Sequence, residues 1–442
     1  MARRQHIVLF PFLAQGHIIP FLALAKLITR RYPGRFTVTL VSTPLNVRSL
    51  RQEIPFRSAD HGLPPDTENT DSVPFQDLIR IFQASTTLQP QFERLIIAEK
   101  LGVFHAIFNT CGAFGTAVYF SMWMNLPHSH TTSEDDFWVP GFPESFRLHL
   151  SQLSPTLRYA DGADPWSSVI RQQIALCLSS KAILCNTVEG LEPMGMALLR
   201  KIAGLCVWSI GPVHPLETTN SAGRGARRVP GVDPETCLRW LDAHPPRSVL
   251  YVSFGSQNSI SAAQMMALAA GLEATRRPFI WVIRPPFGFD VKAEFKDEWL
   301  PKGFEDRTGK SGRGLLVRNW SPQLEILSHP SVGGFLSHCG WNSVLESLSR
   351  GFYNSKMMEE ELGVCVELAR GVEQRVSSVE VERVVGLVMD GEKGEDMRRK
   401  AASTAQTIRT AIEEEDNKGT SRRPGRLPSH RSQDRAAGQR SR

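Results

Sequence analysis

The chain has 442 residues, of which 41% are hydrophobic and 22% charged, a composition typical of a two-domain globular protein rather than of a disordered chain. No apolar run reaches the roughly 18–20 residues that cross a bilayer. The seven cysteines are scattered and lack a CxxC pair, which favours reduced thiols over a disulfide framework or a zinc site. The net charge of +6 comes from the end of the chain, because residues 417–442 carry +7 and the other 416 carry −1. We therefore expect a cytoplasmic protein with no membrane span.

The first half alternates short β-branched or aromatic segments with longer helical ones, which is typical of βαβ units and parallel sheets. A helix is predicted at residues 18–30, where a nearly continuous apolar face is suited to packing on a sheet. The strands predicted in this half lie at residues 6–10, 36–42, 105–109, 182–186 and 206–210.

His17 stands between the first predicted strand and the first predicted helix, with Pro20 near the helix start. An imidazole at the carboxyl end of a strand can take a proton from a hydroxyl group that attacks a substrate. A histidine that only caps the helix is the more frequent explanation for such a position. The residues alone leave both interpretations open.

A change in composition separates the two halves. Residues 214–232 are rich in Gly, Ser, Thr and Arg and have no apolar periodicity, as expected of a linker. Asp233 followed by Pro234 is a start signal for a helix. We predict an N-terminal domain at 1–213, a linker at 214–232, a C-terminal domain at 233–416 and a disordered basic tail at 417–442.

The second half repeats the α/β pattern, with strands predicted at residues 248–254, 279–283, 314–317 and 332–336. After the last of these comes a tight turn at 337–340 and a helix that begins near residues 341–343. Backbone N–H groups at such a helix start form an anion site suited to a diphosphate. Two open α/β domains that face each other would place this site in a cleft at the carboxyl ends of their strands.

Polar and aromatic side chains accompany this turn. Trp320 at a strand end is suited to stacking on a flat base, and Gln323 to reading the edge of that base. His338, Asn342 and Ser343 add donors for a diphosphate, and Glu346, one helical turn beyond Asn342, can accept hydrogen bonds from ribose hydroxyls. Any one of these residues could be incidental, but the ordered set favours a nucleotide site.

The segment 319–346 resembles the signature box of the plant UDP-glycosyltransferases, inverting family 1 enzymes of the GT-B fold. Similar matches are FPFLAQGHIIPFL at residues 10–22, DHGLP at 60–64 and YVSFGS at 251–256. The resemblance implies an α/β fold of two facing Rossmann-like domains with an interdomain cleft. It also implies transfer of a sugar, most often glucose, from a UDP-sugar to a hydroxyl of a small hydrophobic plant metabolite.

The resemblance also assigns roles to single residues. It implies that His17 is the catalytic base, and that a monomer binds a UDP-sugar co-substrate and a phenolic, flavonoid, terpenoid or hormone-like acceptor, with no other cofactor, no metal and no nucleic acid. The donor-binding residues that it implies are Ser256, Trp320, Ser321, Gln323, His338, Gly340, Trp341, Asn342, Ser343 and Glu346.

Three departures from the family pattern limit this expectation. The family orients its base with an aspartate at the end of a later strand, but no aspartate occurs between Leu78 and Glu134, and a strand is missing between Ile96 and Glu99. The acidic residue and glutamine that bind the sugar hydroxyls are missing after Gly351. The C-terminal helix, which in the family braces the N-terminal domain, gives way after residue 416 to the basic tail.

Lost exon-like pieces or an erroneous gene model would both produce such gaps. They predict a chain that binds UDP weakly and transfers sugar poorly or not at all. The alternative function is therefore a non-catalytic UDP-binding protein of the same fold. Nucleic-acid binding through the arginine-rich tail is disfavoured because the tail has no aromatic residues and the domains are nearly neutral. A dinucleotide-dependent oxidoreductase is disfavoured because no GxGxxG opens either domain.

Overall fold

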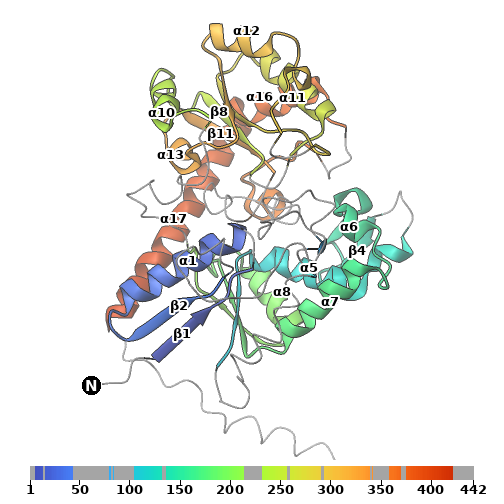
Figure 1. The fold of residues 1–442 in the computed structure, drawn as a ribbon, viewed down its shortest axis with the longest axis vertical. Coiled ribbons are helices and arrows are strands. Elements are labelled where there is room, and N and C mark those ends of the chain that lie inside the picture. The colour runs from blue at the N-terminus through green and yellow to red at the C-terminus, as the bar shows by residue number, and fades with distance from the viewer. Residues whose placement is uncertain are drawn as a thin grey trace, which may run out of the picture.

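The computed structural model comprises two α/β domains, one above the other, with a long C-terminal helix running along one side of both (Figure 1). No helix among the residues that it describes is long and apolar enough to cross a membrane. The described residues are 5–12, 15–42, 79–80, 83, 104–131, 136–213, 231–255, 259–289, 293–338, 341, 358–369 and 375–421.

The N-terminal domain is built on parallel strands in two separate sheets. β1 pairs with β2, and β3, β6 and β7 form the second sheet in that order. All five strands predicted from the sequence are confirmed, with ends that differ by no more than two residues. These strands are β1 (Gln5–Leu9), β2 (Phe36–Leu40), β3 (Ile107–Asn109), β6 (Ala182–Cys185) and β7 (Cys206–Ser209).

Helices and one antiparallel hairpin surround these sheets. The predicted first helix is confirmed as α1, although it begins at Gln15, so His17 lies in its first turn. The hairpin of β4 (Asp136–Trp138) and β5 (Arg147–His149) is not among the predicted strands. The helices are α1 (Gln15–Arg31), α5 (Ala113–Asn125), η4 (Pro127–His130), η5 (Leu150–Gln152), α6 (Pro155–Arg158), α7 (Pro165–Leu178) and α8 (Pro193–Ala203).

The C-terminal domain has one continuous parallel sheet in the order β10-β9-β8-β11. The four predicted strands are confirmed, and every residue of β8 and β9 is buried, as expected of central strands covered on both faces. The strands are β8 (Val249–Ser253), β9 (Phe279–Ile283), β10 (Gly314–Arg318) and β11 (Val332–Ser337). The helices are α10 (Pro234–Asp242), α11 (Ala262–Ala274), η6 (Asp297–Trp299), α12 (Phe304–Lys310), α13 (Gln323–Leu327), η7 (Met358–Leu362), α16 (Ser378–Met389) and α17 (Gly391–Ser421).

The last helix, α17, leaves the C-terminal domain and extends along the N-terminal domain (Figure 1). Ile408 and Ala411 pack against the N-terminal core, and Thr407 lies against Gly190. The helix continues to Ser421, five residues past the predicted end of the C-terminal domain at residue 416. The bracing of the N-terminal domain, whose loss the sequence suggested, is therefore present in this chain.

Candidate functional site

The carboxyl ends of β8 and β11 meet at one side of the site. Ser337, the last residue of β11, donates its hydroxyl to the carbonyl of Ser253 at the end of β8 (3.3 Å). Gly255 follows with φ +78° and lies against the imidazole of His338, so that a Cβ at this position would collide with the ring. Glycine is needed here both for the backbone conformation and for this close approach. His338 is thus held at the carboxyl edge of the sheet, where the sequence placed it.

The loop that carries Trp320 is fixed by hydrogen bonds to its backbone. Arg284, just after β9, donates from Nε (3.0 Å) and Nη2 (2.8 Å) to the carbonyl of Asn319. Asn319 adopts φ +67°, a left-handed conformation that asparagine tolerates better than most residues. The indole of Trp320 is half-buried, which leaves part of its surface available for stacking on a base.

Tyr251 fixes the same loop from within β8. Its hydroxyl lies 2.8 Å from Oγ of Ser321 and donates to Oε1 of Gln323 (3.3 Å). Tyr251 and Ser321 are both buried, so the Ser321 hydroxyl is directed into the domain, and Gln323 begins α13. The structure therefore brings Trp320, Ser321 and Gln323 together and supports them from the central strand.

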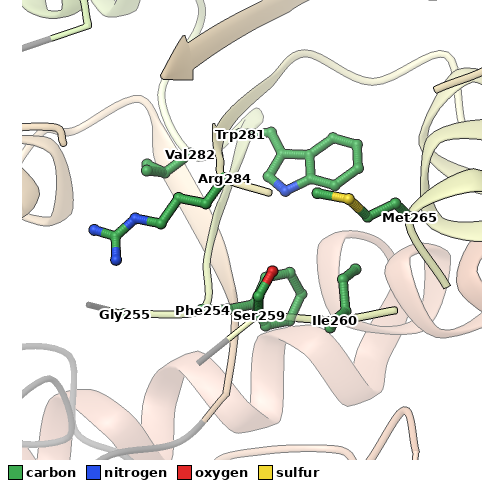
Figure 2. Close-up of a pocket in the computed structure, with 8 residues that line it drawn as sticks. All are labelled: Phe254, Gly255, Ser259, Ile260, Met265, Trp281, Val282 and Arg284. Carbon is green, nitrogen blue, oxygen red and sulfur yellow. The ribbon is translucent and has the colours of Figure 1, made fainter. Parts of the chain in front are cut away.

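A small pocket lies beside this loop, at the ends of β8 and β9 and the start of α11 (Figure 2). Nε1 of Trp281 is buried and finds no acceptor among the described residues, and it points into the pocket. Such a donor can be satisfied by a water or by an oxygen of a ligand. Arg284 borders both the pocket and the Trp320 loop. The lining residues are Phe254, Gly255, Ser259, Ile260, Met265, Trp281, Val282 and Arg284.

Trp341, one of the predicted donor-site residues, lies against the N-terminal domain. Its indole is 5% exposed, and Nε1 donates to the carbonyl of Asn186 in the N-terminal domain (2.7 Å). The ring also lies against Gly112, where a Cβ would be 2.7 Å from Cζ3. In this structure Trp341 joins the two domains. The predicted donor-site residues Ser256, Gly340, Asn342, Ser343 and Glu346 lie outside the described residues.

His17 lies at the N-terminal side of the site, at the carboxyl end of β1. Its Nδ1 is 3.2 Å from Oγ1 of Thr110, which directly follows β3, and its ring meets the edge of Phe12 at 5.5 Å between centroids. Burial lowers the pKa of His17 from 6.5 to about 4, so the imidazole is neutral at pH 7 and able to accept a proton.

The turn that carries Thr110 is tightly pinned. The side chain of Asn109 donates to the carbonyl of Cys111 (3.0 Å) and to Oγ1 of Thr116 in α5 (2.7 Å). Glu192, fully buried, accepts from the backbone N–H groups of the first two residues of α5, each at 3.0 Å. Burial raises the pKa of the Glu192 carboxyl, and these hydrogen bonds oppose the shift.

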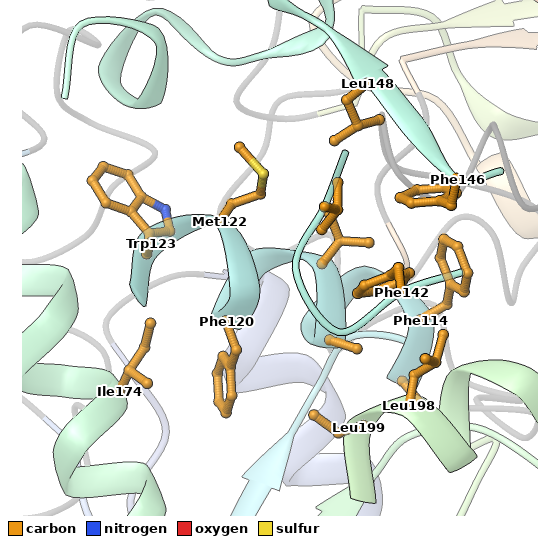
Figure 3. Close-up of a cluster of buried hydrophobic side chains, with 14 of the residues drawn as sticks. Phe114, Phe120, Met122, Trp123, Phe142, Phe146, Leu148, Ile174, Leu198 and Leu199 are labelled. Atoms are coloured by element: carbon orange, nitrogen blue, oxygen red, sulfur yellow. The ribbon is translucent and has the colours of Figure 1, made fainter. Parts of the chain in front are cut away.

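The helix that follows this turn is embedded in the largest core cluster of the N-terminal domain. Phe114 of α5 packs edge to face with Phe142 and Phe146, and Met122 and Trp123 are buried farther along the same helix (Figure 3). A rigid helix behind a pinned turn gives Thr110 a well-defined position beside His17.

Four residues that shape the site were not predicted from the sequence, namely Thr110, Glu192, Tyr251 and Arg284. Thr110 and Arg284 each follow a predicted strand directly, a position that brings a side chain to the carboxyl edge of a sheet. Tyr251 lies inside a predicted strand, and nothing in its immediate neighbours marks its hydroxyl as a support for Ser321. No group of three or more metal-ligating side chains occurs within the described ranges.

The fold and the site define a class of protein: two facing Rossmann-like domains, with an imidazole on one and an aromatic, polar nucleotide-type site on the other. The sequence model of the family described as UDP-glucoronosyl and UDP-glucosyl transferase matches residues 221–355. Crocetin glucosyltransferase 3 from Crocus sativus is 46% identical over 449 aligned positions, which cover 89% of this chain and 92% of that protein.

Solved structures agree in fold. UGT73P12 of Glycyrrhiza uralensis, complexed with glycyrrhetinic acid 3-O-monoglucuronide, superposes with a TM-score of 0.74 at 24% identity, covering 95% of this chain and 96% of that one. UGT2 of Phytolacca americana, complexed with UDP-2fluoro-glucose and pterostilbene, superposes with a TM-score of 0.69 at 26% identity. The superposition covers 92% of this chain and 95% of that one. The chain belongs to the plant UDP-glycosyltransferases and has their GT-B fold.

Proposed function

We propose that this chain binds a UDP-sugar, with glucose as the sugar, and transfers the sugar to an oxygen of a small hydrophobic metabolite. The crocetin glucosyltransferase supports glucose as the donor sugar, and the complex with UDP-2fluoro-glucose and pterostilbene supports a donor and an acceptor bound to one fold. The C-terminal domain (233–416) would hold the donor and the N-terminal domain (1–213) the acceptor. The ten donor-site residues predicted from the sequence, with Trp341 at their margin, form the proposed UDP site.

The chemistry follows from the two sides of the site. The acceptor oxygen attacks the anomeric carbon, the bond from that carbon to the β-phosphate oxygen breaks, and UDP leaves with the negative charge. The acceptor proton passes to His17, whose neutral imidazole has a free lone pair to receive it. His338 and the backbone of the turn after β8 would face the diphosphate and stabilise its developing charge.

One observation carries the proposal: the Trp320 loop is locked in place by Tyr251 and Arg284 beside the end of β8, where His338 also lies. We expect Trp320→Ala to weaken UDP binding by about 10–100-fold, because base–aromatic stacking contributes about 1–3 kcal/mol. Isothermal titration with UDP measures this effect. Combining Trp320→Ala with His338→Ala should weaken binding further.

His329→Ala is the matched control, because His329 pairs with Asp242 (3.1 Å) just before β11, at the opposite edge of the sheet from the proposed site. This variant should bind UDP like the unmodified chain. Equal UDP affinity in Trp320→Ala, in the double variant and in the control would refute the proposed donor site.

Specific observations also favour the second candidate, a UDP-binding protein without transfer. The relative from Crocus sativus aligns over 449 positions, more than the 442 residues of this chain, although only 89% of this chain takes part. The relative therefore has segments that this chain lacks. UDP binding without turnover would select this candidate.

A further inference from the structure

The pair formed by His17 and Thr110 has a consequence for catalysis that rests on the proposed function. The family places an aspartate next to its base, and the sequence has none in the expected region. In the structure the partner of His17 is a threonine hydroxyl, 97% shielded from solvent and 3.2 Å from Nδ1. It reaches the ring from the neighbouring strand end, on the turn that Asn109 and Glu192 hold in place.

We propose that Thr110 positions His17 in place of the missing aspartate, and that this neutral partner restricts efficient transfer to acceptors whose oxygen ionises readily. A neutral imidazole has one N–H and one free lone pair. When Nδ1–H donates to Oγ1 of Thr110, the lone pair remains on Nε2, the nitrogen that can accept the acceptor's proton. In that tautomer Thr110 holds the ring, and the basic nitrogen Nε2 is left for the acceptor's proton.

A hydroxyl orients the ring as an aspartate would, but it supplies no negative charge. When His17 takes the proton, the imidazolium that forms has no carboxylate beside it, and burial disfavours that charge. Proton transfer from an alcohol of high pKa is therefore slow. Acidic phenols release the proton more easily, and carboxylic acids are already ionised at neutral pH, so that the new O–C bond forms without proton transfer.

The titratable neighbours of the pair, among the described residues, do not replace the missing charge. The Cys111 thiol next to Thr110 is exposed and adds no negative charge, because the ordinary pKa of a thiol, about 8.5, leaves it mostly neutral at pH 7. Glu192 lies beyond Cys111, and its oxygens are engaged by the N–H groups of Ala113 and Phe114. A carboxylate introduced at position 110 would be the nearest negative charge to His17.

The test compares Thr110→Asp, Thr110→Val and Thr110→Ser with the unmodified chain. Histidine-selective ¹⁵N NMR reports the tautomer and the pKa of His17 without any need for turnover. We expect Thr110→Asp to raise that pKa by at least one unit, Thr110→Val to lose the Nδ1–H tautomer, and Thr110→Ser to retain it. Thr39→Val is the matched control, because Thr39 makes the same type of contact with His6 (2.7 Å) elsewhere in the domain.

Turnover with UDP-glucose and a series of substituted phenols tests the acceptor preference. We expect rates in the unmodified chain to fall steeply as the phenol pKa rises, and Thr110→Asp to speed the least acidic phenols by about 10–100-fold, within the range for an orienting carboxylate. Thermal unfolding shows whether each variant is folded. If the tautomer and the pKa of His17 are unchanged in all three folded variants, the role of Thr110 is overturned. An NMR response without turnover for any acceptor would overturn the proposed transfer and leave the positioning role standing.

Discussion

The two domains of this protein differ in how well their described strands are covered. In the C-terminal domain four strands form one sheet, and β8 and β9 are buried along their whole length. Among the described residues of the N-terminal domain, the parallel strands form two sheets, and Val8 in β1 is 42% exposed, although parallel strands of α/β proteins are normally covered on both faces. Within the described part of the chain, the C-terminal sheet is therefore the better covered one, and the N-terminal domain, the proposed acceptor half, depends more on individual side-chain contacts.

A further difference lies in how each half fixes the residues of the site. The Trp320 loop is supported by Tyr251 in β8 and by Arg284, which directly follows β9. His17 is supported by a single neutral hydroxyl, and the turn behind that hydroxyl depends on the buried carboxylate of Glu192. We therefore expect the loss of one contact in the proposed acceptor half to lower the free energy of unfolding by more than a similar loss in the proposed donor half.

The largest expected effect is that of Glu192→Ala. It removes the acceptor of two buried N–H groups at the start of α5, each of which costs about 1–3 kcal/mol when left unsatisfied. We expect a loss of about 3 kcal/mol in the free energy of unfolding. Urea unfolding measures this loss, and hydrogen exchange at Ala113 and Phe114 should report it locally.

Asp233→Ala provides the comparison in the donor half. Asp233 caps α10 through the N–H of Thr236 (3.2 Å), but the cap is exposed, so its removal should cost only about 1 kcal/mol. Equal losses in the two variants would show that the acceptor half is not the more vulnerable one.

The next largest effect is expected at the Trp320 loop of the C-terminal domain. Tyr251→Phe removes the hydroxyl that contacts Ser321 and Gln323 while keeping the buried ring, which stacks on Phe335. The loss of these hydrogen bonds should loosen the Trp320 loop and weaken UDP binding by about 5–10-fold, corresponding to about 1 kcal/mol. Calorimetric titration with UDP tests this prediction. An unchanged affinity for UDP would mean that Tyr251 does not support the Trp320 loop.

Most of the fold could be predicted from the sequence because its signals are local. Short β-branched strands between longer helical segments located all nine parallel strands, and Asp233 with Pro234 marked the start of α10. The hairpin of β4 and β5 was missed because its antiparallel pairing lies outside the alternation of strands and helices on which the prediction was based. The end of α17 was predicted too early, since the change to a basic composition begins before the helix stops.

The site was predictable only in part, for a different physical reason. Trp320, Gln323 and His338 stand in one contiguous motif, so their order alone suggested a nucleotide site. Their supports come from afar: Tyr251 and Ser321 are 70 residues apart, and His17 and Thr110 are 93 apart. Contacts between side chains so distant in the chain depend on the register of strands, which composition and periodicity do not specify.

The smallest expected effect concerns the boundary between the two halves. Glu361, in η7 of the C-terminal part, lies close to Glu192, and burial, together with the charges of Glu192 and Glu360, raises the pKa of Glu361 from 4.5 to about 7. A carboxyl whose pKa is raised by folding stabilises the folded state fully below pH 4.5, and this stabilisation is lost as the pH rises through 7. The side chain is exposed, so solvent screens most of this effect, and Glu361→Gln should raise the Tm by only about 1 °C at pH 8 and leave it unchanged at pH 4.5.

Glu359→Gln is the control for this effect, because it removes the same charge from the same turn. Differential scanning fluorimetry at the two pH values distinguishes the cases. A gain at pH 8 confined to Glu361→Gln would tie the effect to the approach of Glu192 across the domain boundary. Equal gains in Tm in both variants would show that the effect comes from repulsion among the three glutamates of η7. In that case the contact between Glu361 and Glu192 across the domain boundary would not contribute.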